Sequence, residues 1–528
     1  MAEVRLVSRR RRRALVLRSS PAVVAAALLL GGALPYMAGG SQAYLSYLVL
    51  ADRTDAQGAA LADSAVRAAG GRVVQDYPQV GMVLAYAADG GFATRLRGRP
   101  GIAAVGATRT AAVPGPPGAL AGAGDFHRPA AADAVEGDST PTVPDPGEHG
   151  GWNLAMMGAD PTAPDVGSLL AAPGSAPAPG ATAVPGSAPA SVQAATSAPP
   201  ETPPRNSAQR ESALRQVLVA VLDSGVDDTH PDLRDAVSPA DSVSCADGRP
   251  DARYGAWRPD PGVAESGHGT HVAGLIGAAR DGHGVVGTAP GVRIAAVRLL
   301  GPLGQYYPEN IVCGLLWAAD HGAVAVNDSY FADPWKYNCP QDPDQGAMVQ
   351  AVGRAVAYAQ RRALVVASAG NDAQDLTGPR TDQRSPNDRL SGPAEDRRLG
   401  AECIRLPGEL PGVVSVSAVT RSGAVADYSN FGDGRITLAA PGGDPDGGPD
   451  EAIVSDWPGG RYAALAGTSM SAAQVTGAIA VAAALHADWG PDRLRELLLA
   501  QARANCPVGP GRCRDRSTYG AGIVALPR

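Results

Sequence analysis

Apolar and polar positions alternate between residues 44 and 105 in a pattern that predicts a small domain of four strands and two helices. The first helix is expected to stop at Gly70 and Gly71, because glycine commonly ends helices. The predicted strands are 45–50, 72–77, 80–86 and 102–105, and the predicted helices are 56–69 and 91–98. The resulting order, βαββαβ, is typical of a ferredoxin-like α+β domain.

From Val217 onward, short apolar runs alternate with segments of helical composition. Val and Ala dominate these runs, as expected for strands that are buried on both faces. The predicted strands are 217–222, 293–299, 323–326, 363–367 and 413–416, and the predicted helices are 271–279, 311–320, 347–361, 470–486 and 492–502. The alternation predicts an α/β domain built on a mostly parallel, doubly wound sheet.

The sequence between these two domains is rich in Pro, Gly, Ala and Ser, and the whole chain of 528 residues has 66 Gly and 46 Pro. Sequence of this kind cannot bury enough apolar surface to offset the entropy lost on ordering. We therefore expect a linker at 111–147 and a disordered insert at 161–208. Residues 148–160 include Trp152 and two Met residues, so this segment is expected to pack on a folded part of the chain.

The first 43 residues have the three-part layout of a secretory signal peptide. A basic cluster at 9–13 precedes an apolar run at 21–34, and Ser41-Gln42-Ala43 follows as a small-x-small cleavage site. The alternative is a signal anchor retained in the membrane, but the apolar run is short for a membrane span. No other segment has the composition of a transmembrane helix. We therefore expect a secreted, extracellular protein.

The charge and the cysteine content narrow the protein class further. A net charge of -7 and a pI of about 5.7 disfavour a general nucleic-acid binder, which usually carries a basic surface. None of the six cysteines lies in a CxxC pair, so a zinc site is disfavoured, and an even number in an exported chain favours disulfides. Cys506 and Cys513 are close enough to close a small loop. The other four allow three pairings: Cys245, Cys313, Cys339 and Cys403.

Two segments place a carboxylate and an imidazole at the ends of predicted elements. Asp223 follows the apolar strand 217–222, and active sites of α/β sheets gather at the C-terminal ends of strands. The alternative for Asp223 is a residue that caps the next turn. His268 lies between glycines at a predicted helix start. His271 is interpreted as a packed or capping residue, because the His-x-x-x-His spacing with Glu of a zinc protease is absent.

Two further segments place an amide and a hydroxyl in similar positions. Asn371 follows a strand that ends in small residues, where its side-chain amide could donate to an oxyanion, although an isolated Asn there is usually a turn residue. Ser469 opens a long apolar helix and could be an N-cap. The free N–H groups and positive dipole of a helix start also favour an alkoxide or oxyanion beside this hydroxyl.

Together, the segments DSG, GHGTHVAG, ASAGN and GTSMSA resemble the subtilisin-like serine proteases (subtilases), and they occur in the family's chain order of Asp, His, Ser. The resemblance extends from about Val217 to the C-terminus and implies a peptidase domain at 209–528. Residues 44–110 resemble the inhibitory prodomain of this family. Trp152-Asn153-Leu154, within 148–160, resembles the start of its catalytic region.

The resemblance implies a role for each matching residue. Ser469 would attack the scissile carbonyl, His268 would accept and return its proton, and Asp223 would orient His268. Asn371 would complete the oxyanion hole. It also implies protein or peptide substrates, the chain's own prodomain as an inhibitor, no nucleic-acid partner and a monomer. The substrate-binding positions that it implies are Ser329, Tyr330, Ser368, Ala369 and Gly370.

The sequence departs from the usual family pattern at three places. Ala473 and Gln474 stand where the family usually has Pro and His, but neither position supplies the triad. Tyr330 and Phe331 replace smaller or aliphatic residues, which predicts narrower and more apolar subsites nearby. The polar stretch 372–402 is expected to form a long surface loop.

No cofactor is expected to be required for catalysis, but the resemblance implies a structural calcium site. Asp232 and the loop containing Asp281 match calcium-ligand positions of the family, and carboxylate and backbone oxygens suit this ion. The alternative is that both are solvated acids in turns, since one expected ligand has no counterpart in the sequence.

The sequence therefore favours a secreted serine endopeptidase made as a prodomain-inhibited precursor. The alternative is a catalytically weak, exported binding protein that uses a protease fold.

Overall fold

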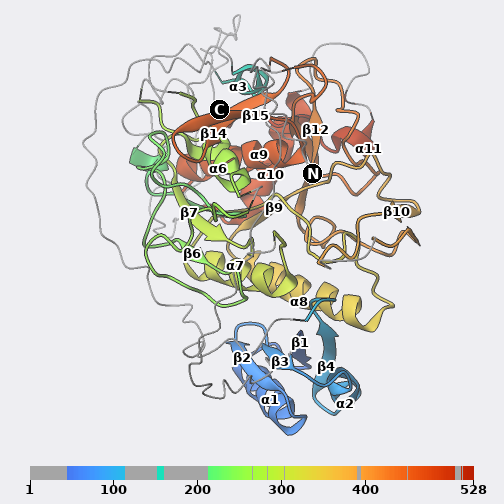
Figure 1. Cartoon of the computed structure of the whole chain (residues 1–528). Helices are drawn as coiled ribbons and strands as arrows, with labels where there is room; N and C mark the ends of the chain where they lie inside the picture. Colours follow the sequence, from blue (N-terminus) through green and yellow to red (C-terminus); the bar gives the residue numbers. More distant parts are fainter. Residues whose placement is uncertain are drawn as a thin grey trace, which may run out of the picture.

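Figure 1 shows the chain as a computed structural model. Three predictions lie outside the described residues: the signal peptide at 1–43, most of the linker at 111–147, and the insert at 161–208. The structure describes residues 44–112, 151–159, 212–263, 266–281, 284–301, 304–388, 394–448, 450–505, 513 and 515–527.

Residues 44–112 form a small domain with a four-stranded antiparallel sheet of order β2-β3-β1-β4. Successive side chains of a strand point to opposite faces. Tyr47 and Val49 therefore pack on the two helices, whereas Leu48 and Leu50 face the other way. The βαββαβ prediction is confirmed. The elements are β1 (Leu45–Ala51), α1 (Ala56–Ala68), β2 (Arg72–Tyr77), β3 (Met82–Ala87), α2 (Phe92–Leu96) and β4 (Ile102–Ala107).

The centre of the larger domain is a seven-stranded sheet of order β13-β12-β9-β8-β5-β7-β6. Every pairing within it is parallel, so the predicted parallel sheet is confirmed. The C-terminal ends of all its strands consequently meet at one edge, where α/β proteins build their sites. The strands are β5 (Leu218–Asp223), β6 (Val243–Ser244), β7 (Arg293–Arg298), β8 (Ala325–Asp328), β9 (Leu364–Ser368), β12 (Val414–Val419) and β13 (Leu438–Pro441).

Helices cover both faces of this sheet, which makes it doubly wound as predicted (Figure 1). Val219 and Val221 of β5 belong to the same apolar cluster as residues of α6, α9 and α10. Leu218 and Leu222 point to the opposite face, where they pack with residues of α7 and α8. The helices are α6 (His268–Gly277), α7 (Pro308–Asp320), α8 (Pro343–Ala359), α9 (Thr468–Leu485) and α10 (Pro491–Ala504).

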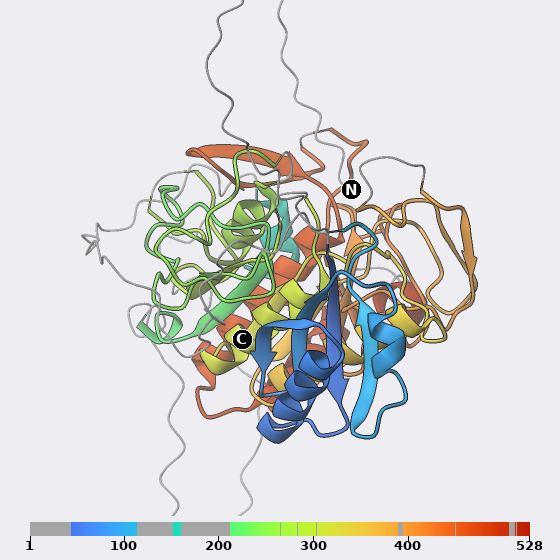
Figure 2. The same ribbon diagram turned by 60° about the horizontal axis from the view of Figure 1, so that its bottom comes forward.

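The small domain lies directly against α7 and α8 of the larger domain. Figures 1 and 2 show its sheet beside these helices in both views. Leu48 and Leu84 of the small sheet join the same buried apolar cluster as Ile311 in α7 and Met348 in α8. One continuous core therefore joins the two domains across this contact.

The polar stretch 372–402 is not a plain loop, because its described part contains a short antiparallel ribbon. This ribbon consists of β10 (Arg380–Asp382) and β11 (Arg397–Leu399). Disulfides join Cys245 to Cys313 and Cys339 to Cys403. Cys506 lies outside the described residues, so its pairing with Cys513 stays a prediction. The remaining elements are α3 (Trp152–Met156), β14 (Ile453–Trp457), β15 (Arg461–Leu465) and α11 (Arg516–Tyr519).

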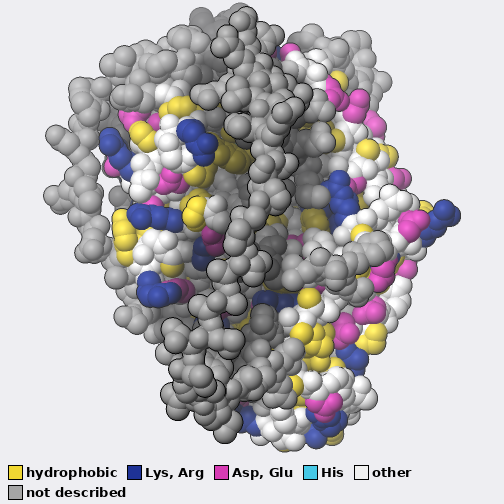
Figure 3. All heavy atoms as spheres, viewed as in Figure 1, with side chains coloured by type: hydrophobic (Ala, Val, Ile, Leu, Met, Phe, Trp, Pro, Cys, Tyr) yellow, Lys and Arg dark blue, Asp and Glu magenta, His cyan; other side chains and the backbone are white. Residues whose placement is uncertain are grey.

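Among the described residues, one helix is long and apolar enough to cross a membrane, and it is α9. This helix is 94% buried inside the fold, as expected for the core helix of a folded domain. Basic and acidic side chains lie interspersed over the described part of the face in Figure 3.

Candidate active site

β5 delivers Asp223 to the edge of the sheet, because the carboxylate belongs to the last residue of this strand. Its side chain is fully buried. The backbone N–H of Ser224 donates to Oδ1 at 2.7 Å, and the hydroxyl of Tyr306 lies 3.4 Å from the same oxygen. A buried carboxylate held by donors in this way has a fixed direction, which a residue that orients an imidazole needs.

The first residue of α6 is His268, and its ring meets Asp223 across 45 positions of sequence. Nδ1 of His268 lies 2.8 Å from Oδ1 and 3.0 Å from Oδ2 of Asp223. The close approach depends on Gly269, because a Cβ there would lie 2.4 Å from the carbonyl oxygen of Gly225 and 3.0 Å from Cβ of Asp223. The GHG sequence thus lets the helix start touch the strand end.

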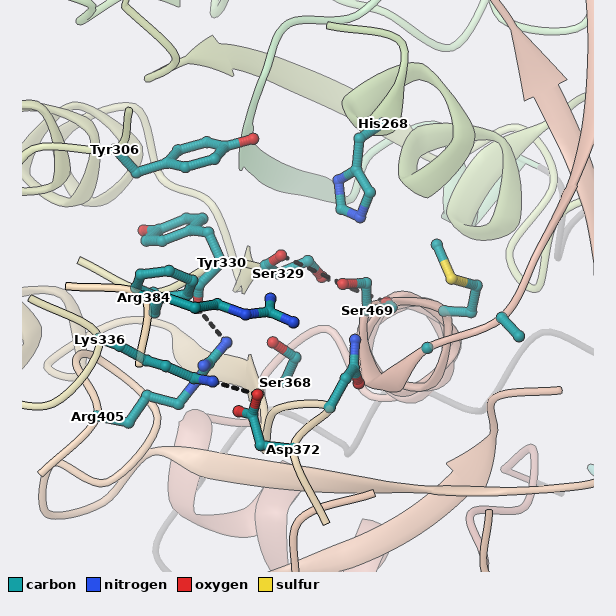
Figure 4. A pocket seen from close by; sticks show the side chains of 15 residues that line it. His268, Tyr306, Ser329, Tyr330, Lys336, Ser368, Asp372, Arg384, Arg405 and Ser469 are labelled. Carbon is teal, nitrogen blue, oxygen red and sulfur yellow. Dashed lines mark hydrogen bonds and ion pairs between the residues drawn. The ribbon is translucent and has the colours of Figure 1, made fainter. Parts of the chain in front are cut away.

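The second residue of α9 is Ser469, and it lines the same pocket as His268. Figure 4 shows the His268 ring above the Ser469 side chain. The Ser469 hydroxyl donates to the carbonyl oxygen of Ser329 at 3.2 Å, so in this structure it is turned toward β8 rather than bonded to the imidazole. A rotation about the Cα–Cβ bond of Ser469 separates this rotamer from one that points at His268.

Asn371 follows β9, and its side chain is anchored to the start of α9. Oδ1 accepts from the backbone N–H of Thr468 at 2.9 Å and from the Thr468 hydroxyl at 2.7 Å. An N–H can only donate, so these bonds fix which end of the amide is the oxygen. Nδ2 therefore remains as a donor beside the first turn of the helix, whose own N–H groups lack intrahelical partners.

His271 is a structural residue, as predicted. Its ring is completely buried, with Nε2 3.2 Å from the carbonyl oxygen of Ile453 and 3.1 Å from that of Ala463. Burial, together with the smaller effect of the neighbouring His268, lowers the pKa of His271 to about 3. It is therefore neutral and joins α6 to β14 and β15.

The comparison with known families decides the assignment. The profile of the subtilase family matches residues 215–522, which is more than half of the chain and includes Asp223, His268, Asn371 and Ser469. The chain belongs to the subtilase family. It is therefore a subtilisin-like serine protease by family.

Relatives and solved structures agree with this assignment. The subtilase is 31% identical to fervidolysin from Fervidobacterium pennivorans over 54% of this chain and 37% of that protein. It is 30% identical to subtilisin Savinase from Lederbergia lenta over 58% of this chain and 88% of that protein, and to M-protease from Shouchella clausii over 62% of its length. The chain thus spans about a third of fervidolysin and under two thirds of M-protease.

Two crystal structures share the fold over most of the chain. The epidermin leader peptide processing serine protease from Staphylococcus aureus superposes with a TM-score of 0.59 at 19% identity, covering 92% of this subtilase and 97% of that chain. Fervidolysin gives a TM-score of 0.55 at 21% identity, with coverage of 92% and 61%. At these identities the likeness shows the fold alone.

The predicted substrate-binding residues divide into two groups. Ser329, Tyr330 and Ser368 line the pocket that also holds His268 and Ser469. Ala369 and Gly370 are not among its lining residues, and their backbone N–H groups are bonded within the protein. The Ala369 N–H donates to Val416 and the Gly370 N–H donates to the Thr468 hydroxyl.

Sequence reasoning missed the aromatic stack that covers Asp223. The rings of Tyr306 and Tyr330 stack with centroids 4.9 Å apart, and the Tyr330 hydroxyl donates to Oδ1 of the buried Asp328 at 2.6 Å. Burial raises the pKa of Asp328 to about 7; the bond from Tyr330 opposes this rise, and the charge of Asp223 adds to it. A polar residue at the end of an apolar strand was the available signal for Asp328.

The replacement of the usual Pro-His pair also has a structural explanation. Nε2 of Gln474 donates to the carbonyl oxygen of Pro441 at 2.6 Å, and its Oε1 accepts from Nδ2 of Asn153 at 3.1 Å. Gln474 thereby joins α9 to β13 and to α3. The resemblance of Trp152-Asn153-Leu154 to the start of the catalytic region agrees with this contact.

Asp232, one of the two predicted calcium ligands, is held by donors of the protein. Oδ2 of Asp232 accepts from the backbone N–H of Val285 at 3.2 Å and lies 3.1 Å from the hydroxyl of Tyr462. Among the described residues, the acids and histidines close enough to share a metal here are His230, Asp232 and Asp456, without Asp281. Calcium takes six to eight oxygen ligands. The described acids and histidines here offer fewer oxygen ligands than calcium takes, and the calcium site at Asp232 and Asp281 stays a prediction.

Proposed function

We propose that this chain is a serine endopeptidase that hydrolyses peptide bonds through Asp223, His268 and Ser469. The observation that carries the proposal is the pairing of His268 Nδ1 with the buried Asp223 carboxylate, on the rim of a pocket that also contains Ser469 and Asn371. A carboxylate that accepts from Nδ1–H favours the tautomer in which Nε2 of the same ring carries the basic lone pair.

In the proposed acylation step, the Ser469 hydroxyl turns from the Ser329 carbonyl toward His268 and attacks the scissile carbonyl carbon. His268 takes the hydroxyl proton and delivers it to the leaving amine as the C–N bond breaks. Nδ2 of Asn371 and the backbone N–H of Ser469 donate to the oxyanion. Water, activated by the same imidazole, then hydrolyses the acyl-enzyme and restores the Ser469 hydroxyl.

We further propose that the small domain, residues 44–110, is an inhibitory prodomain. Its continuous core with α7 and α8 supports a tight complex. The segment after β4 extends this contact, since the backbone N–H of Thr110 donates to Asp388 at 2.7 Å. Asp388 neighbours Asn387, whose amide donates at 2.6 Å to Asp333, and Asp333 accepts from the backbone of Tyr306 at the pocket. The chain therefore leaves the small domain on the side of the active site.

Secretion is also proposed rather than established. The basic, apolar and small-x-small order of residues 1–43 supports a signal peptide. Two disulfides in the described chain are consistent with an oxidising compartment.

The alternative, a weak binding protein on a protease fold, has one observation in its favour, which is the Ser469 hydroxyl bonded to Ser329 instead of His268. Labelling with a serine-directed fluorophosphonate separates the two functions. We expect stoichiometric labelling that is lost in Ser469→Ala and strongly slowed in His268→Ala. Ser471→Ala is the matched control, since Ser471 lies two residues along the same helix and bonds only to Ala440. Absence of labelling in the mature protein would support the binding protein.

Maturation provides a second test. N-terminal sequencing of the secreted protein should give a mature start between the small domain and Trp152. The same measurement on Ser469→Ala should give an uncleaved precursor, because a self-processing enzyme needs its nucleophile. Cleavage of both at the same position would show that another protease matures the chain.

A further inference from the structure

The pocket beside Ser469 has a charged wall that a simple apolar subsite would lack. Four charged side chains line it together with Tyr330 and Phe331. The expectation of narrower, more apolar subsites stays a prediction, and the aromatic residues are accompanied by charges from three distant segments. The charged residues are Lys336, Asp372, Arg384 and Arg405.

Lys336 and Asp372 neutralise each other. Nζ of Lys336 forms an ion pair with Oδ1 of Asp372, and both side chains are largely buried. Burial lowers the pKa of Lys336, Asp372 raises it, and Arg405 and Arg384 lower it further. All three cations therefore lie near enough to act on one another, and the pair itself contributes no net charge to the wall.

Arg405 is buried and held from several sides. Its guanidinium lies 4.9 Å from the centre of the Phe331 ring, and NH2 donates to the Tyr330 carbonyl oxygen at 3.4 Å. It also rests against Gly370, where an added Cβ would lie 3.2 Å from Cζ. Gly370 immediately precedes Asn371, so this cation stands beside the oxyanion donor.

Arg405 forms no ion pair among the described residues, although its charge lowers the pKa of Asp372 and opposes the rise in the pKa of Asp333. The carboxylate of Glu409 accepts from the Arg405 backbone N–H, but it is paired with the guanidinium of Arg380 at 2.5 and 2.8 Å. Arg384 is exposed, and among the described residues its side chain has no hydrogen-bond or ion-pair partner. The wall holds three cations and one carboxylate, so it has an excess of two positive charges.

The position of this wall determines which part of a substrate would meet it. His268 must protonate the leaving amine, so the leaving group lies on the His268 side of Ser469. Figure 4 shows Lys336, Arg405 and Asp372 on the opposite side of Ser469 from His268. The residue that contributes the scissile carbonyl therefore directs its side chain toward the cationic wall.

We propose that this pocket selects substrates with Glu or Asp on the acyl side of the scissile bond, with Arg405 and Arg384 binding the carboxylate. The proposal rests on the proposed peptidase function. An unpaired guanidinium beside the reacting carbonyl favours a carboxylate through charge-assisted hydrogen bonds. A neutral amide of the same shape would leave both cations uncompensated.

The test uses the mature enzyme and internally quenched peptides that differ only at the residue on the acyl side of one scissile bond. Glu is compared with Gln, Asp with Asn, and Leu and Lys serve as references. We expect kcat/KM for Glu to exceed that for Gln by about 10-fold to 100-fold, the worth of one hydrogen bond to a charged group. Mass spectrometry of the products confirms that the acidic residue is C-terminal in its fragment.

Three substitutions test whether Arg384 and Arg405 cause the preference for Glu. Arg384→Gln and Arg405→Gln should each reduce the Glu-to-Gln ratio several-fold, and Arg384→Glu should favour Lys over Glu. Arg398→Gln is the matched control, because Arg398 is an exposed arginine in strand β11 and does not line the pocket. Arg405 is buried, so thermal unfolding of Arg405→Gln checks its fold, while the exposed Arg384 provides the independent result.

Fluorophosphonate labelling of the same preparation separates the two possible failures. An enzyme that is not labelled contradicts the proposed function. Three results from a labelled enzyme would overturn the acidic preference. These are a Glu-to-Gln ratio of one or less, cleavage before the acidic residue, and an unchanged ratio in both Arg384→Gln and Arg405→Gln.

Discussion

The guanidinium of Arg109, just after β4, lies 2.9 Å from the carboxylate of Glu309 in α7, and the Glu309 side chain is fully buried. Ser46 of the small domain donates to the same carboxylate at 3.2 Å. Arg109 also stacks 3.9 Å above the ring of Tyr307. The small domain thus compensates the buried charge of Glu309 in the larger domain. We therefore expect the Arg109–Glu309 ion pair to contribute to the stability of the contact between the two domains.

We therefore expect Arg109→Ala to release the cleaved small domain at least about 30-fold faster, because removing one partner leaves Glu309 buried without its cation. Size-exclusion chromatography and recovery of activity after processing measure this release. Arg95→Ala is the control, since Arg95 forms an exposed pair with Asp89 inside the small domain. Equal release from both variants would contradict the importance of the buried pair.

Asn371 is expected to donate to the oxyanion through Nδ2 and to be oriented by the bonds that its Oδ1 accepts from Thr468. Two substitutions separate these two contributions. Asn371→Asp keeps an acceptor for the Thr468 N–H and hydroxyl but loses the amide donor, so kcat should fall by about 10²–10³ while the fold is retained; that range comes from subtilisin itself. Thr468→Val keeps the donor and removes one bond that orients it, so its loss should be smaller. Steady-state kinetics with a small ester substrate provides the measurement. A wild-type kcat in Asn371→Asp would exclude the oxyanion role.

Asp328 predicts a pH dependence of stability. Its pKa is about 7 in the folded protein, mainly because of burial, against 3.8 as the ordinary value. Between these values the folded state holds a proton that the unfolded state has lost, so the free energy of unfolding falls as pH rises through this window. Asp328→Asn, which retains an acceptor for the Tyr330 hydroxyl, should remove this loss.

The measurement is the melting temperature of Ser469→Ala with and without Asp328→Asn, from pH 5 to pH 8. The difference in favour of the Asn variant should grow with pH. Asp375→Asn is the control: hydrogen bonds from Thr377 lower the pKa of this exposed carboxyl below its ordinary value of 3.8, so its difference should stay constant from pH 5 to pH 8. For Asp328→Asn, a difference that stays constant or shrinks toward pH 8 would contradict the prediction.

The two disulfides are expected to affect different properties. Cys339–Cys403 and Cys245–Cys313 close loops of similar size, with sequence separations of 64 and 68, so removing either should cost about 4 kcal/mol of stability in the chain-entropy model. Only Cys339–Cys403 joins the segments that carry Lys336 and Arg405. Its double Ser variant should therefore also lower the Glu-to-Gln ratio, as measured with the same peptides. The Cys245 and Cys313 variant should melt earlier with its ratio intact.

Element types and the candidate triad were predictable because they depend on short-range sequence. The apolar segments 45–50 and 217–222 each correspond to a strand in the structure. Asp223, His268, Asn371 and Ser469 each belong to a local motif at an element end, and the parallel sheet brings such ends together. Gly269 illustrates why such a motif can be read from local sequence, because only glycine fits where the start of α6 touches the end of β5.

The tertiary structure alone decided which charges meet. Arg384 and Arg405 come from segments that the sequence describes only as polar or irregular, and no local pattern directs them to Ser469. The pairing of Glu309 with Arg109 spans 200 positions, and both residues are ordinary in their own segments. Long-range contacts of this kind depend on how the helices and loops pack, because an electrostatic partner needs proximity and burial but no particular spacing in the chain.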